Sequence, residues 1–321
     1  MKRGDGGASV VDLQRRLRSF GHLLVDEGGY YGPATTAAVE RYQLHAGLDV
    51  DGICGRVTWN ALVEAGHQLG DRLLYYRSPM MRGDDVSQLQ RQLGALGFDP
   101  GRVDGIFGPR GAAALAEFQR NSGLANDAIC GPETVLALQR LGRSTATLPV
   151  AQVREFERLS GAPRSLDQLR LALVDPGGLG ALVSATAHLL RDNGSRVAIL
   201  DHPDGSSQAK EANALGAGAF LAFRVSQQPG VRALFFQTSG FESLGGRKLA
   251  HLVVESLEPV GFKPGELLGR RLPVLRETRM PAIVVELGPP MEVVTQTAEI
   301  ASALLRTLME WVLSPMDLGS M

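Results

Sequence analysis

The sequence predicts an α/β protein in which two small three-helix repeats precede a domain with a mostly parallel sheet covered by helices. Two observations predict this organisation. The first half of the chain repeats itself without a gap at a constant offset of 76 residues, and the second half alternates short apolar strands with helical stretches. The 321 residues are enough for two or three domains with cores of their own.

Short motifs that recur in the same order and at one offset define the repeat. Leu13-Gln14-Arg15 matches Leu89-Gln90-Arg91, and Gly32-Pro33 matches Gly108-Pro109. Further matches are Tyr42-Gln43 with Phe118-Gln119, Gly47-Leu48 with Gly123-Leu124, and Ile53-Cys54-Gly55 with Ile129-Cys130-Gly131. So many matches without a gap indicate duplication. The two repeats are expected over residues 5–68 and 80–143.

Each repeat is expected to form three short helices. Apolar residues recur at helical spacing at the start of both copies, as Val10, Leu13 and Leu17 and again as Val86, Leu89 and Leu93. Ser9 and the pair Asp84-Asp85 are suitable N-caps, and Gly21 and Gly97 suit the left-handed position that follows a helix. Because a unit of about 60 residues has a small core, the repeats are expected to pack together.

The repeat motifs resemble the peptidoglycan-binding repeat of cell-wall enzymes, which runs V-x-x-L-Q-x-x-L, D-G-x-F-G-x-x-T, F-Q and G-L-x-x-D-G-x-x-G-x-x-T. The second repeat follows this pattern at Asp104-Gly105-Ile106-Phe107-Gly108 and departs from it at Asp127-Ala128. The first follows it at Asp51-Gly52-Ile53-Cys54-Gly55 and departs at Glu27-Gly28-Gly29. The resemblance implies two peptidoglycan-binding-like repeats whose glycan-binding residues are unknown. The alternative is a helical module that no longer binds glycan.

The pattern changes after a linker expected over residues 144–166, with at most one short helix around Val150 to Leu159. The next domain is expected over residues 167–314. Its expected strands are Leu171–Val174, Arg196–Leu200, Ala219–Val225, Ala233–Gln237 and Ala282–Leu287. Its expected helices are Ala181–Asp192, Ser207–Leu215, Gly246–Glu258 and about Glu292–Val312. Alternating strands and helices indicate a mostly parallel sheet, whose active sites form at the carboxyl ends of the strands.

Three stretches of this domain resemble the zinc-dependent N-acetylmuramoyl-L-alanine amidases of type 3, with motifs D-P-G-H-G-G, A-N-x-x-x-A-D-x-F-I-S-I-H-A-N and L-R-E-T-x-M-P-A-V-L-V-E-x-G-F. The first is Asp175-Pro176-Gly177-Gly178, and the second begins at Ala212-Asn213. The third, Leu275-Arg276-Glu277-Thr278-Arg279-Met280-Pro281-Ala282, is the most specific. The family cleaves the amide between muramic acid and the first alanine of the peptidoglycan stem.

The resemblance also implies that the metal ligands are missing. The family holds zinc with two histidines and a glutamate and uses a late glutamate as general base. At matching positions the histidines are replaced by Gly178 and Arg224, and no acidic residue follows Gly180 before Asp192. Only the late glutamate is matched, as Glu286. Glycine has no side-chain donor and arginine stays protonated, so we expect no metal and no other cofactor.

Two alternatives concern other ligands for a metal. Asp175, His202 and Glu286 all follow expected strands and could form a relocated site, although none has the spacing of a strong metal motif. Cys54 and Cys130 occupy equivalent positions and could pair or share a metal, although such cysteines are more often small core residues. His188 and His251 are expected on helix surfaces.

Arg224 is expected to lie beside Glu286 and to neutralise it. In the resembled family the second histidine and the late glutamate face the same metal-bound water from two strands. Without the metal, a carboxylate in a cleft would lack a cation, and an unpaired buried carboxylate is costly. The guanidinium can supply that charge, and the pair would then be structural. Glu286 would be a remnant of the general base.

The composition and the N-terminal segment indicate which partners and which cellular compartment we expect. Hydrophobic residues make up 44% and charged residues 21%, and the net charge of −1 gives no reason to expect a nucleic-acid partner. No apolar run reaches the roughly 20 residues of a membrane span, so no transmembrane segment is expected. The segment Met1 to Gly7 is not followed by the apolar run of a secretory signal, which favours a cytoplasmic protein.

Repeats of this kind ahead of a metal-less amidase domain resemble actinobacterial pseudo-amidases that regulate peptidoglycan-precursor synthesis. The expected function is therefore non-catalytic binding and regulation. The resemblance implies a peptidoglycan fragment or a lipid-linked precursor as partner, together with an enzyme of precursor synthesis. The first alternative is an active, exported zinc N-acetylmuramoyl-L-alanine amidase whose true N-terminus is missing. The second is a wall-anchoring module without regulation.

Overall fold

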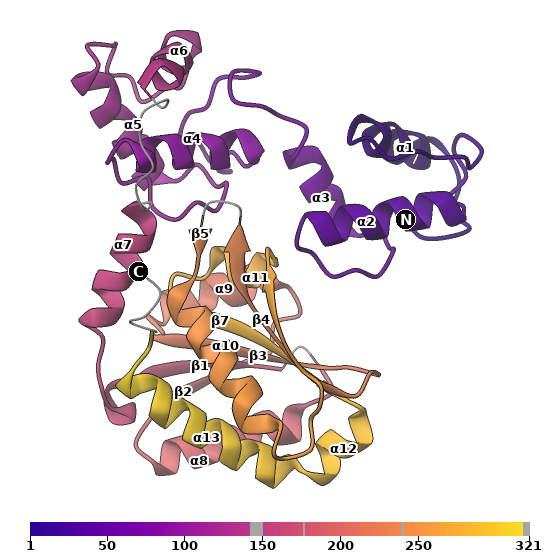
Figure 1. The fold of residues 1–321 in the computed structure, drawn as a ribbon, viewed down its shortest axis with the longest axis vertical. Coiled ribbons are helices and arrows are strands. Elements are labelled where there is room, and N and C mark those ends of the chain that lie inside the picture. The colour runs from indigo at the N-terminus through magenta and orange to yellow at the C-terminus, as the bar shows by residue number, and fades with distance from the viewer. Residues whose placement is uncertain (142–149, 176, 239–240, 317–321) are drawn as a thin grey trace. The chain divides into compact units, whose positions relative to one another are not determined.

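The computed structural model describes residues 1–141, 150–175, 177–238 and 241–316 (Figure 1). The chain divides into two compact units, Met1–Ala151 and Gln152–Met321. The first part of the predicted linker, up to residue 149, lies outside the described residues. Its remainder contains helix α7 (Val150–Ser160), at the place where the sequence predicts a short helix, and the 3-10 turn η1 (Leu166–Gln168).

The first unit contains the six helices that the repeat predicts. The first repeat forms α1 (Ala8–Ser19), α2 (Pro33–His45) and α3 (Arg56–Glu64). The second forms α4 (Asp84–Ala95), α5 (Pro109–Asn121) and α6 (Pro132–Leu141). The buried apolar residues form one cluster in each repeat: Val10, Tyr31, Val39 and Leu62 belong to the first, and Val86, Phe107, Leu115 and Leu138 to the second. The duplication has therefore produced two separate cores.

Glycines lie at both ends of the first helix of each repeat. The expected N-caps are wrong, because Gly7 and Gly83 occupy the cap positions of α1 and α4 and no side chain caps either helix. Asp85 is instead buried and ion-paired, with Oδ2 2.7 Å from Nε of Arg72. Gly21 confirms its prediction: it has φ of 81° and follows α1, and the amide of His22 donates to the carbonyl of Leu17 at 3.1 Å.

Buried glutamines hold the loops of each repeat from inside. Nε2 of Gln43 donates to Oδ1 of Asp51 at 2.7 Å, to the carbonyl of Ile53 at 3.0 Å and to Oγ1 of Thr58 at 3.0 Å. Gln119 makes the same contacts in the second repeat, with Asp127, Ile129 and Thr134. A buried amide must have hydrogen-bond partners, and here the partners are loop atoms and a threonine hydroxyl in the helix that follows the loop. The F-Q and Y-Q motifs therefore determine loop shape.

One of these loops explains where the second repeat departs from its family pattern. Gly52 has φ of 65°, and Ala128 takes the equivalent place with φ of 56°. The amides of both residues donate to the glutamine Oε1, at 3.0 Å to Gln43 and 2.9 Å to Gln119. A left-handed conformation is unfavourable for a residue with a Cβ. The hydrogen bond thus holds Ala128 in a conformation that suits glycine.

The second unit is built on one mixed sheet. Its strands are β1 (Arg170–Val174), β2 (Arg196–Leu200), β3 (Ala219–Val225), β4 (Gly230–Thr238), β5 (Phe241–Glu242), β6 (Gly265–Arg270) and β7 (Ala282–Gly288). Their order within the described residues is β2-β1-β3-β7-β4-β5, with β6 paired to β4. β2, β1, β3 and β7 are parallel, whereas β4 runs antiparallel to β7. The mostly parallel sheet is confirmed, whereas the reversal of β4 and the strands β5 and β6 were not predicted from the sequence.

Helices cover both faces of this sheet (Figure 1). The described helices are α8 (Gly180–Asp192), α9 (Gly205–Ala214), α10 (Leu244–Leu257), α11 (Pro273–Glu277), α12 (Pro290–Thr295) and α13 (Thr297–Leu313). The single final helix that the sequence predicts is therefore two, α12 and α13, and the short α11 was missed. Along the described chain, no helix combines the length and apolar character that crossing a membrane requires.

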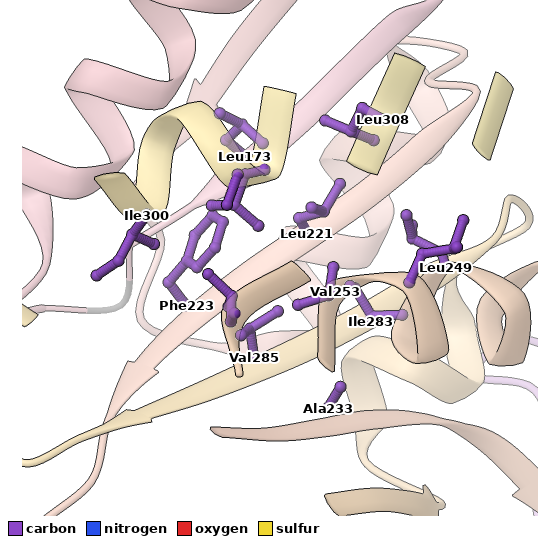
Figure 2. Close-up of a cluster of buried hydrophobic side chains, with 14 of the residues drawn as sticks. Leu173, Leu221, Phe223, Ala233, Leu249, Val253, Ile283, Val285, Ile300 and Leu308 are labelled. Atoms are coloured by element: carbon purple, nitrogen blue, oxygen red, sulfur yellow. The ribbon is translucent and has the colours of Figure 1, made fainter. Parts of the chain in front are cut away.

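The main core lies between one face of the sheet and helices α8, α10 and α13. Leu221 and Phe223 of β3, with Ile283 and Val285 of β7, point toward these helices (Figure 2). Leu249 and Val253 of α10, and Ile300 and Leu308 of α13, meet them there (Figure 2). Side chains alternate along a strand. Arg224, which follows Phe223, and Glu286, which follows Val285, therefore belong to the other face of the sheet.

The two cysteines are buried and unpaired, each in the core of its own repeat. The alternative of a disulfide or shared metal between them is therefore wrong, and the expectation of small core residues is confirmed. Burial raises the pKa of the Cys54 thiol to about 11 and that of Cys130 to about 12.

We expect Ala128→Gly to stabilise the protein. Glycine relieves about 1 kcal/mol of left-handed strain and loses about 0.5 kcal/mol through the greater freedom of the unfolded chain. Gly52→Ala is the matched control and should cost at least about 1 kcal/mol, since its Cβ would lie 2.9 Å from Cγ2 of Thr36. Urea unfolding followed by circular dichroism measures both. Destabilisation by Ala128→Gly would contradict this account.

We also expect stability to fall above pH 9 because of the thiols. Above that pH the unfolded thiols lose protons while the buried ones keep theirs, so the free energy of unfolding decreases by about 1 kcal/mol per thiol near pH 10. Urea unfolding at pH 8 and pH 10 measures this decrease. The Cys54→Ala/Cys130→Ala variant should lose less between the two pH values. An equal decrease in both proteins would show that the thiols do not contribute.

Candidate functional site

The predicted residues meet at the carboxyl ends of the parallel strands. Arg224 of β3 and Glu286 of β7 are direct partners in register. Arg232 of β4 is the direct partner of Glu286 on its other side. Three neighbouring strands thus place a carboxylate between two guanidinium groups on the face opposite the main core.

The closest contact is with the residue that the sequence did not predict. Nη2 of Arg232 lies 2.9 Å from Oε2 of Glu286, whereas Nη1 of Arg224 lies 3.9 Å from Oε1. The Glu286 side chain is 16% exposed and each arginine side chain 33% exposed. The prediction that Arg224 pairs with Glu286 is confirmed. The stronger interaction, judged by distance, is the one with Arg232.

The direction of β4 explains why Arg232 was missed. Arg232 lies near the start of β4, and in a parallel sheet the start of a strand is at the amino edge, far from Glu286. Because β4 is antiparallel to β7, its start lies beside the carboxyl end of β7. The signal that could have revealed this direction is the short connection between β3 and β4, residues 226–229, since a parallel strand needs a crossover of about a dozen residues or more.

The turn between β3 and β4 holds Arg232 in place. Its Nη2 donates to Oγ of Ser226 at 3.2 Å, and its Nη1 is 3.5 Å from Oε1 of Gln228. The same Ser226 Oγ accepts the amide of Gln228 at 3.1 Å. The guanidinium is therefore oriented by the turn as well as by Glu286, which lowers the entropy cost of forming the ion pair.

The charges alternate beyond these three residues. Glu266 of β6 is the register partner of Arg232. Across β3, β7, β4 and β6 the row therefore reads Arg224, Glu286, Arg232 and Glu266. Opposite charges on neighbouring strands stabilise a sheet modestly, by about 0.2–1 kcal/mol a pair. The ion pairs shown by distance join the first three residues of this row.

Gly178 lies beside the end of β3, as expected. It has φ of 103°, and a Cβ added there would lie 3.9 Å from Cγ1 of Val225, the residue after Arg224. The preceding Asp175 shapes the same loop, because its Oδ1 accepts the amides of Gly177 at 2.9 Å and Leu179 at 3.2 Å. The positions of Gly178, Arg224 and Glu286 therefore belong to one edge of the sheet.

The residues at this edge do not fit a zinc ion. Zinc in proteins is held by Cys, His, Asp or Glu, and here two guanidinium groups lie against the carboxylate of Glu286. Within the described part of the chain, no three metal-ligating residues gather into a site. The relocated set of Asp175, His202 and Glu286 is thus wrong, and Nδ1 of His202 accepts the amide of Asp204 at 3.1 Å.

The remaining predicted residues are structural. His188 and His251 lie on helix surfaces, each about 3.4 Å from an acidic side chain one turn away. Asn213 joins two of the motif stretches: its Nδ2 donates to the carbonyl of Glu277 at 2.8 Å, and its Oδ1 accepts the amide of Arg279 at 2.8 Å. This part of the amidase-like sequence maintains the fold at the edge of the sheet opposite Glu286.

We expect Arg232→Ala to lower the free energy of unfolding by about 1–3 kcal/mol, because it removes the closest cation from a mostly buried carboxylate. Arg224→Ala should cost less, since its contact is longer. Adding Glu286→Gln to Arg232→Ala should recover part of the loss. Urea unfolding measures all variants, with Arg196→Ala at the exposed start of β2 as the matched control. Additive losses in this cycle would contradict a coupled site.

Comparison with known proteins agrees with both halves of the fold. A model described as a putative peptidoglycan binding domain matches residues 6–62 and 82–138. The chain is 33% identical to N-acetylmuramoyl-L-alanine amidase CwlM of Mycobacterium tuberculosis over 90% of this chain and 81% of that protein. It is 35% identical to N-acetylmuramoyl-L-alanine amidase CwlL of Bacillus licheniformis over 44% of this chain and 45% of that one.

Solved structures with a similar fold include the N-acetylmuramyl-L-alanine amidase Ami1 of Mycobacterium smegmatis. That likeness has a TM-score of 0.39 and 15% identity, and it covers 44% of this chain and 96% of that one. The assignment rests on the sequence relatives, above all on the match that spans most of both chains. The chain described here belongs to the N-acetylmuramoyl-L-alanine amidase family.

Proposed function

We propose that this chain is a non-catalytic, peptidoglycan-related binding and regulatory protein, a pseudo-amidase that controls cell-wall precursor synthesis. The observation that carries the proposal is the ion-paired group of Arg224, Glu286 and Arg232 at the strand ends. In this proposal Glu286 is the remnant of the family's general base, and the chain uses neither zinc nor another cofactor.

The chemistry of that group argues against hydrolysis. A zinc amidase needs a metal-bound water whose pKa is near 7, and neither arginine nor glycine can ligate the metal. A general base must also be free to accept a proton, and the Glu286 carboxylate is held by a guanidinium at 2.9 Å. The second guanidinium, that of Arg224, lies 3.9 Å from the other carboxylate oxygen.

The repeats support the binding half of the proposal. Both match a putative peptidoglycan binding domain, and their loops are held by the internal glutamines. Loops with fixed shape lose little entropy when they bind a ligand. We propose a peptidoglycan fragment or the sugar-peptide part of a lipid-linked precursor as ligand, and an enzyme of precursor synthesis as protein partner, within the cytoplasm.

An active zinc amidase is the second candidate. One observation favours it: the relative matched over 90% of this chain carries the name of an N-acetylmuramoyl-L-alanine amidase. In that case the enzyme would cleave the muramoyl-L-alanine amide bond. Because Gly178 and Arg224 cannot ligate zinc, other residues would have to hold the metal in such an enzyme.

We expect the purified full chain to release no stem peptide from peptidoglycan or a muramoyl-peptide when zinc is added, and to retain no stoichiometric zinc. Chromatography of the products and elemental analysis measure the two results, with an active zinc amidase as positive control. Zinc-dependent release that Glu286→Gln abolishes would establish the second candidate and reject the first.

Affinity capture from native cytoplasm tests the regulatory half. The full chain should retain an enzyme of precursor synthesis, and a soluble muramoyl-peptide should change the amount retained. Retention that is the same for a variant lacking residues 1–141 and is insensitive to the muramoyl-peptide would count against regulation through the repeats.

A further inference from the structure

A cavity lies in the amidase-like unit, at the opposite edge of the sheet from Glu286. Its volume is about 470 Å³. The residues just before β3 and β7, such as Ala217 and Pro281, form its floor, and the ends of α7 and α13 contribute Leu159 and Trp311. This size is within the range of about 300–1,000 Å³ that is usual for small-molecule sites.

The lining of the cavity is apolar, and two arginines lie at its margin. Leu159, Leu169, Met280, Trp311 and Val312 supply buried or nearly buried apolar surface. Arg158 and Arg279 also line the cavity, and both are exposed. Among the described residues that line it there is no aspartate or glutamate. The charge of the margin is therefore positive.

The polar groups inside the cavity are already used by the fold. The indole N–H of Trp311 donates to the carbonyl of Gly245 at 3.1 Å. The side-chain amide of Asn213 is also used, because its Nδ2 donates to the carbonyl of Glu277 and its Oδ1 accepts the amide of Arg279. The interior thus offers packing but few hydrogen bonds, which suits a hydrocarbon chain rather than a sugar or a nucleotide.

Arg158 differs from a mobile surface charge. Nη1 of Arg158 donates to the backbone carbonyl of Arg279, which holds the guanidinium at the cavity margin. A planar guanidinium has several donors and binds phosphate or carboxylate oxygens in pairs. An apolar interior with two guanidinium groups at its margin is complementary to a hydrocarbon chain that ends in an anion.

We propose that this cavity binds a single-chain amphiphile with an anionic head group. The hydrocarbon chain would lie between Leu159, Met280 and Trp311, and Arg158 and Arg279 would bind a phosphate or carboxylate head. This site goes beyond the proposed function, because it uses neither the repeats nor the Arg224–Glu286–Arg232 group.

The fluorescence of Trp311 can report the binding of an amphiphile in this cavity. The chain has two tryptophans, Trp59 and Trp311, so Trp59→Phe leaves the cavity residue as the sole indole reporter. Titrating the full-length Trp59→Phe protein with dodecyl phosphate or dodecanoate, below micelle-forming concentrations, should change Trp311 fluorescence to saturation. Dodecanol should bind about tenfold more weakly or worse, because it lacks the charge-assisted hydrogen bonds. Dodecyltrimethylammonium and inorganic phosphate alone should give no saturable change.

Variants in the same background identify the site. Arg158→Gln/Arg279→Gln should weaken dodecyl phosphate binding at least about tenfold and leave dodecanol binding nearly unchanged. Arg164→Gln, next to the cavity in sequence but outside its lining, is the matched control. Ala162→Phe should block the chain, with circular dichroism as the check on folding. No saturable change in the parent, or equal affinity in folded forms of all these variants, would overturn the proposal.

Discussion

The Glu286 carboxylate needs a cation, and this need organises the carboxyl edge of the sheet. The side chain is mostly buried, and an unpaired charge there would be costly. Arg232 meets that need from β4 at 2.9 Å, and Arg224 adds a longer contact from β3. Both contacts require the register of β3, β7 and β4 to be as it is, since a slip by one residue would turn these side chains to the other face.

Buried polar groups also determine the shape of the repeats. Each buried glutamine must find partners for its amide, and it finds them in loop carbonyls, a threonine hydroxyl and an aspartate. The loops thereby obtain one shape without a large core or a disulfide. The left-handed Ala128 illustrates the strength of this constraint, because the loop retains its geometry although the glycine is lost.

The two edges of the sheet in the amidase-like unit differ in chemistry. At the carboxyl edge, two guanidinium groups lie on either side of one carboxylate, so the negative charge of Glu286 is balanced within the protein. At the amino edge, the arginines border an apolar cavity without acidic lining among its described residues. The two edges of one family fold therefore present different chemistry, and each edge has to be considered as a site by its own residues.

The amino-acid sequence by itself determined the elements that depend on local pattern. The gapless duplication predicted six helices, and apolar runs placed β1, β2, β3 and β7 within a residue or two. The motifs also identified Gly178, Arg224 and Glu286 as neighbours. The tertiary structure decided the place of β4 beside β7, the contact of Arg232 with Glu286 and the link from Asn213 to the segment at Glu277. These depend on pairing between segments far apart in the chain, which the local pattern of each segment does not specify.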